Sequence, residues 1–97
     1  MKTVSFDFER IGSMEDFYKI AKNELRLPDY FGENLNALWD CLTGDLELPV
    51  QVRFINLSMN QLEQFDKLIG LFEDASVELN GSLVFEYYLK QDSLEYF

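Results

Sequence analysis

LPDYFGENLNALWDCLTG, residues Leu27–Gly44, places an aromatic loop directly before a short helix. Asn34 is a suitable N-cap because its side chain can accept a hydrogen bond from a free backbone N–H of the first turn. The pattern predicts a helix over Leu35–Thr43, and Gly44 is well placed to end it. Two ring-bearing residues, Tyr30 and Phe31, are therefore expected near the N-terminal end of this helix.

The predicted helix has two different faces. Leu35, Leu38 and Leu42 form an apolar stripe, whereas Asn36 and Asp40 are four residues apart and share the opposite face. We expect that second face to be exposed, with the rings of Tyr30 and Phe31 beside it, so that Tyr30, Phe31, Asn36 and Asp40 are candidate partner-binding residues. Such a surface is rich in acceptors, since one carboxylate can receive two parallel hydrogen bonds from a guanidinium.

A simpler interpretation of the same residues remains open. Tyr30 and Trp39 could be core aromatic residues, and Asp40 could be a solvated surface charge. Charge supports a binding role, because this region contains several carboxylates and neither Lys nor Arg. These carboxylates belong to Asp29, Glu33, Asp40, Asp45 and Glu47.

Alternating polarity and capping residues predict the other elements. Ser13 can cap the first helix, and Pro28 ends that helix at or before Leu27. The strands are expected at Lys2–Phe8, Val50–Asn56 and Leu83–Leu89.

A single third helix is expected after Ser58, with a continuous apolar face. The short connection from Asn56 leaves little room for an extra helix. The residues on that face are Leu62, Phe65, Leu68, Ile69, Phe72 and Ala75.

The resulting order is β-α-α-β-α-β, which favours right-handed crossovers and a parallel sheet. The predicted fold class is therefore α/β. We expect one domain over residues 1–90, and the tail 91–97 receives no assignment.

Composition limits the possible functions. The chain has 97 residues and a net charge of −10. An acidic surface does not neutralise phosphates, so direct nucleic-acid binding is not expected. It attracts cationic partners, although a large charge can also serve solubility alone.

Catalysis is not expected either. The chain has no His and a single Cys, Cys41, which excludes a Cys-His nucleophile. No metal-binding or phosphate-binding loop is present, so we expect no cofactor and no metal. The absence of a long apolar run predicts no membrane segment, and the lone cysteine suits the cytoplasm.

YFGENLNALWDCLTG closely resembles the characteristic region of the barstar family, intracellular inhibitors of the secreted ribonuclease barnase. The resemblance is strongest over Leu27–Pro49 and extends loosely over residues 2–90. It implies a three-stranded parallel sheet packed by three to four helices, and an inhibitor that does no chemistry. The second helix and the loop before it would plug the active site of a ribonuclease.

The resemblance also implies roles for particular residues. Asp40 would occupy the place of a substrate phosphate and bind arginines, while the ring of Tyr30 would pack over a catalytic histidine. Asp74 would replace a glutamate at the rim. The other positions that match the border of the interface are Asn34, Leu35, Trp39, Thr43, Gly44 and Glu47.

Two positions depart from the family pattern. The family usually carries aspartate where this chain has Asn36, and the position of Asp45 can be aromatic. The expected partner is therefore either a basic, barnase-like extracellular ribonuclease or a different basic nuclease or toxin, for which the chain would be an immunity protein. We expect the free protein to be a monomer.

Overall fold

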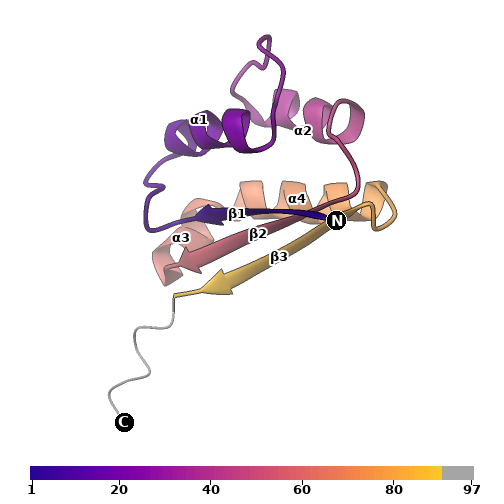
Figure 1. Cartoon of the computed structure of the whole chain (residues 1–97). Coiled ribbons are helices and arrows are strands. Elements are labelled where there is room, and N and C mark those ends of the chain that lie inside the picture. Colours follow the sequence, from indigo (N-terminus) through magenta and orange to yellow (C-terminus); the bar gives the residue numbers. More distant parts are fainter. Residues whose placement is uncertain (91–97) are drawn as a thin grey trace.

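A computed structural model describes residues 1–90 (Figure 1). It contains three strands and four helices in these residues. In chain order they are β1 (Lys2–Asp7), α1 (Met14–Glu24), α2 (Leu35–Gly44), β2 (Val50–Leu57), α3 (Met59–Gln64), α4 (Asp66–Glu78) and β3 (Leu83–Leu89). The tail 91–97 lies outside the described residues, and the domain boundary at residue 90 stays a prediction.

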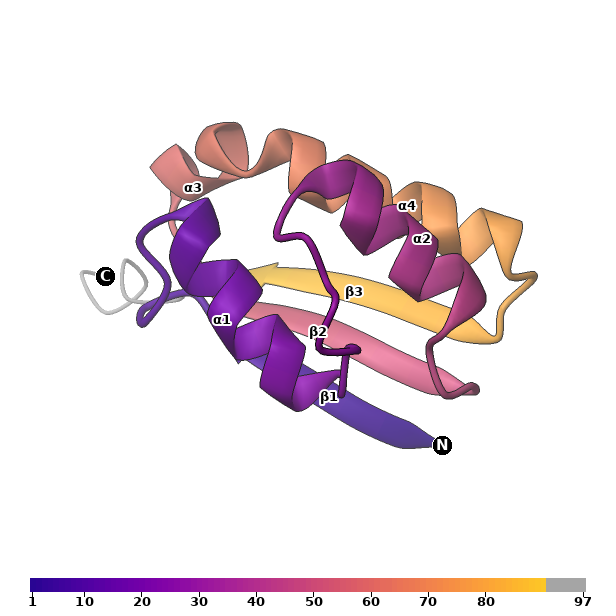
Figure 2. The same cartoon turned by 90° about the horizontal axis from the view of Figure 1, so that it is seen from above.

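The strands form one parallel sheet in the order β1-β2-β3. Val4 pairs with Val52, and Val52 pairs with Phe85. The predicted α/β class and parallel sheet are confirmed. Because both crossovers run in the same direction across the sheet, the helices lie on one side of it (Figures 1 and 2).

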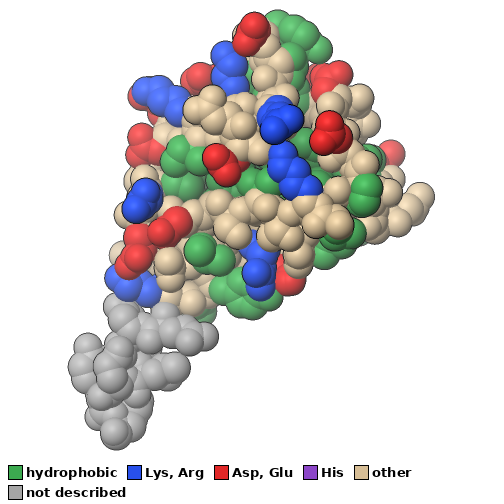
Figure 3. All heavy atoms as spheres, viewed as in Figure 1, with side chains coloured by type: hydrophobic (Ala, Val, Ile, Leu, Met, Phe, Trp, Pro, Cys, Tyr) green, Lys and Arg blue, Asp and Glu red, His purple; other side chains and the backbone are tan. Residues whose placement is uncertain are grey.

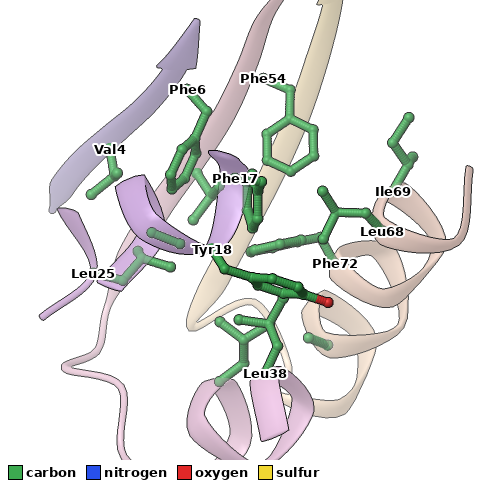
Figure 4. Close-up of a cluster of buried hydrophobic side chains, with 14 of the residues drawn as sticks. Val4, Phe6, Phe17, Tyr18, Leu25, Leu38, Phe54, Leu68, Ile69 and Phe72 are labelled. Carbon is green, nitrogen blue, oxygen red and sulfur yellow. The ribbon is translucent and has the colours of Figure 1, made fainter. Parts of the chain in front are cut away.

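The core lies between the sheet and the helices and is rich in aromatic rings. Phe17 on α1 contacts Phe6 and Phe54 of the sheet, with ring centroids 4.9 and 5.7 Å apart. Phe72 on α4 completes this cluster at 5.3 Å from Phe54 (Figure 4). All four side chains are fully buried.

The other side of the sheet carries polar side chains. Gln51 on β2 accepts a hydrogen bond from Thr3 at 3.2 Å and donates one to Glu86 at 3.0 Å. The hydroxyl of Tyr88 donates to Glu86 at 2.8 Å. Successive side chains of a strand point to opposite faces of the sheet, so the polar residues of the alternating pattern lie on this side and the apolar residues face the helices.

The expected single third helix is wrong, because the chain forms α3 and α4 with a break at Phe65. The expectation that no extra helix would fit is also wrong. Phe65 leaves the helical conformation (φ −108°, ψ 22°) and packs against Phe8, with ring centroids 5.1 Å apart. Gln61 fixes α3 separately by donating hydrogen bonds to the carbonyls of Phe8 and Ile11, both at 2.9 Å.

Candidate functional site

The loop before α2 is shaped by Asn34. Its Oδ1 accepts a hydrogen bond from the Ala37 N–H at 2.8 Å, and its Nδ2 donates to the Gly32 carbonyl at 3.0 Å. The predicted N-cap is thereby confirmed. One side chain therefore fixes both the start of α2 and the path of the loop that precedes it.

The two faces of α2 are as expected. Leu38 and Leu42 are fully buried, and Cys41 is 4% exposed. Asn36 and Asp40 are exposed on the opposite face. Neither side chain makes a hydrogen bond or an ion pair within residues 1–90, so the Asp40 carboxylate is available to a partner.

Tyr30 is the exposed aromatic residue of the loop, with 76% of its surface accessible. Its hydroxyl donates a hydrogen bond to Oδ2 of Asp45 at 3.4 Å. The negative charge of Asp45 raises the pKa of Tyr30 above its usual value. This loop projects at the top of Figure 1, and hydrophobic and acidic side chains cover the projection in Figure 3. The interpretation of Tyr30 as a core residue is therefore wrong.

Phe31 differs from its expected position. It was expected on the surface beside Tyr30, but it is 8% exposed and packs edge-on against Tyr18, with ring centroids 5.7 Å apart. The Phe31 N–H also donates to the Pro28 carbonyl at 3.0 Å. Burial leaves Phe31 with the role of anchoring the loop, and its contact with a partner stays a prediction.

A groove between α2 and α4 brings four of the predicted site residues together, although they are separated by up to 39 positions in the sequence. Trp39 and Leu35 are partly buried and form its apolar part, while Asn36 and Asp74 are exposed. The residues that line the groove are Leu35, Asn36, Trp39, Lys67, Gly70, Leu71 and Asp74. The sequence interpretation missed Lys67, Gly70 and Leu71. The spacing of Lys67 and Asp74, seven residues on one helix, could have indicated a shared face.

The remaining predicted residues lie toward the end of α2. The Thr43 hydroxyl donates to the Trp39 carbonyl at 2.8 Å, so it is used within the helix. Gly44 is the last residue of α2 and is exposed. Glu47 is exposed in the next loop and lines a separate small pocket with Lys2. The structure therefore places Glu47 apart from the groove.

Electrostatics favours cationic ligands at this surface. The ion pairs of residues 1–90 join Lys19 to Glu15 and Lys90 to Glu9, away from α2. Within the same residues, no group of three or more His, Cys, Asp or Glu side chains could hold a metal ion. Burial and nearby carboxylates raise the pKa of the Cys41 thiol, which disfavours the reactive thiolate.

Comparison with known proteins assigns the family. A family model described as Barstar (barnase inhibitor) matches residues 1–89. The chain belongs to the barstar family. A Bacillus subtilis (strain 168) protein named "Putative ribonuclease inhibitor YrdF" is 38% identical over 73 residues, which cover 75% of this chain and 71% of that protein. None of the helices in residues 1–90 is long and apolar enough to span a membrane.

Proposed function

We propose that this protein inhibits a basic ribonuclease by inserting the exposed face of α2 and the ring of Tyr30 into the active-site cleft. The observation that carries the proposal is the pairing of an exposed, unpartnered Asp40 with a 76% exposed Tyr30 in a member of the barstar family. The name of the B. subtilis relative supports the same activity.

Each part of the site has a chemical role in this proposal. The Asp40 carboxylate takes the place of a substrate phosphate and receives the hydrogen bonds of phosphate-binding arginines. Tyr30 supplies a large ring with few rotatable bonds, which stacks on an imidazole or guanidinium at a small entropic cost. In this proposal Asp74 lies at the rim of the contact. The residues that border it are Asn34, Leu35, Trp39, Thr43, Gly44 and Glu47.

The inhibitor acts without catalysis. It works in the cytoplasm as a monomer, occupies the cleft one-to-one, and protects cellular RNA from the enzyme before export or after entry. The net charge of −10 accelerates encounter with a basic enzyme. The protein itself makes no contact with RNA.

The test is a titration of the protein into activity assays of barnase and a panel of related secreted ribonucleases. Inhibition should saturate at one-to-one and weaken with added salt, because salt screens the charges. Asp40→Ala should weaken binding by about 3–5 kcal/mol, since it leaves cationic groups of the enzyme buried and unpaired. Glu63→Ala, which removes the same charge from exposed α3, is the matched control.

Two results would contradict this proposal. Equal inhibition by Asp40→Ala and the parent would remove Asp40 from the site. A lack of inhibition across the whole panel would leave the family and the fold but reject the ribonuclease as target.

A second candidate is an immunity protein for a different basic nuclease or toxin. Asn36 and Asp45 favour it, because both change the contact surface relative to the family pattern. Asn36→Asp distinguishes the two candidates: it should tighten binding to a barnase-like enzyme that presents a cation at this position, and not to an unrelated target.

A further inference from the structure

The groove between α2 and α4 contains a positive charge on an otherwise acidic surface. Lys67 lines it beside Asn36 and Trp39. From Leu27 to Val52 the chain has neither Lys nor Arg, so α2 contributes no cation of its own. Lys67 is exposed, and within residues 1–90 its ammonium group has no ion-pair or hydrogen-bond partner.

Asn36 adds a second free donor to the lining of the same groove. Its side-chain amide makes no hydrogen bond within the described residues, in contrast to Asn34, whose amide is used twice. Leu35 and Trp39 form partly buried apolar walls next to these polar groups. The groove therefore offers an ammonium and an amide beside partly buried apolar side chains, with the Asp74 carboxylate seven residues along α4 from Lys67.

A basic partner that covers this groove meets an electrostatic conflict. Burying the Lys67 ammonium against a cationic surface is costly unless an acceptor replaces its water. Two free donors that line one groove suit a carboxylate, whose two oxygens can accept hydrogen bonds from both. Asp40, one turn farther along α2 from Asn36, has the opposite preference and suits a guanidinium.

We propose that Asn36 and Lys67 form a carboxylate-binding subsite that receives an Asp or Glu side chain of the ribonuclease. The inference rests on the proposed function and specifies the partner more closely. The enzyme would present an arginine to Asp40 and a carboxylate to the groove, about one helical turn apart. An enzyme with a cation at both places would be rejected, since an unpaired like charge opposes binding.

The test uses association and dissociation rates for the ribonuclease that the parent inhibits most tightly. Lys67→Gln should raise the dissociation rate constant by about tenfold or more, because a charge-assisted hydrogen bond is lost. Lys67→Arg should restore much of the affinity. Lys67→Glu should dissociate faster than Lys67→Gln, since it places like charges together.

Lys19→Gln is the matched control, because it removes the same charge from the exposed face of α1. It should leave dissociation unchanged and slightly accelerate association with a basic enzyme. Asn36→Asp should also accelerate dissociation from this enzyme, because the enzyme presents a carboxylate to the groove. For an enzyme that presents a cation there instead, the same change should tighten the complex. The urea midpoints of the Lys67 variants should equal that of the parent, since Lys67 has no partner within residues 1–90.

Several results would overturn the inference. They are an unchanged or slower dissociation of Lys67→Gln, a tighter complex with Asn36→Asp, or equal effects of Lys67→Gln and Lys19→Gln. In each of them the parent still inhibits, so the proposed function survives. If the parent inhibits no ribonuclease, the proposed function fails and this inference fails with it.

Discussion

The hydroxyl of Tyr30 donates a hydrogen bond to the Asp45 carboxylate at 3.4 Å. Tyr30 belongs to the loop before α2, and Asp45 is the C-cap residue of that helix. The contact therefore links the two ends of the segment that carries Asp40. It gives a structural role to Asp45, one of the two residues that depart from the family pattern.

Asp45→Asn should lower the pKa of Tyr30 toward the usual tyrosine value. The charge of Asp45 opposes formation of the phenolate and is the main cause of the raised pKa. Titration of the Tyr30 ring resonances by NMR, in the parent and in Asp45→Asn, measures the effect. An unchanged Tyr30 titration would show that Asp45 does not act on the ring.

Asn34→Ala should lower the free energy of unfolding by about 0.5–2 kcal/mol, because it removes the N-cap of α2. Asn34→Ser should retain most of the stability, since serine is also a good N-cap. Urea denaturation followed by circular dichroism provides the comparison. Equal losses for both variants would indicate that a different contact is the more important one. This contact is the hydrogen bond from the Asn34 side-chain amide to the Gly32 carbonyl, which serine cannot make.

Phe54→Ala should cost about 3–5 kcal/mol, a large part of the roughly 5–15 kcal/mol typical of folded proteins. The ring of Phe54 is fully buried and lies within 6 Å of five other aromatic rings. Val77→Ala at a 77% exposed position should change stability by less than about 0.5 kcal/mol. Urea midpoints that do not differ between these variants would contradict the described core.

Asp7 should make stability depend on pH in the acidic range. Its carboxylate accepts hydrogen bonds from the Asn56 amide and the Glu9 N–H, both at 3.0 Å, and these lower its pKa in the folded protein. The stabilisation that Asp7 gives is therefore fully present above the pKa that Asp7 has in the unfolded chain. It is lost as the pH falls through the lower pKa that Asp7 has in the folded protein. Asp7→Asn should flatten this part of the pH–stability profile, measured by urea denaturation at a series of pH values. An unaltered profile would assign the acid sensitivity to other groups.

Local patterns were sufficient for most of the fold. Ser13 and Asn34 marked helix starts that the structure confirms, and alternation along β2 placed Val52 and Phe54 in the core. The break at Phe65 was not predictable in this way, because Phe65 fits the apolar face of one continuous helix as well as that of two. It depends on packing against Phe8, a residue 57 positions earlier.

The candidate site shows the same division between local and tertiary information. The exposed face with Asn36 and Asp40 follows from helical spacing alone. The burial of Phe31 depends on Tyr18, and the place of Lys67 in the groove depends on how α4 packs against α2. Sequence patterns indicated the acidic half of the surface. Helical spacing could at most have placed Lys67 on the same face as Asp74, whereas its position beside α2 follows from the assembled fold.

Helices α1 to α4 lie on one side of the sheet, and β3 ends at Leu89 on the side away from the loop that carries Tyr30 (Figure 1). A linker or an affinity tag that leaves the described domain near Leu89 would start on the side opposite the Tyr30 loop. Immobilised through such a linker, the protein would become an oriented capture reagent. It could then be used to retrieve the enzyme proposed as its target on a biosensor chip or a chromatography resin, with the surface proposed to bind that enzyme left accessible.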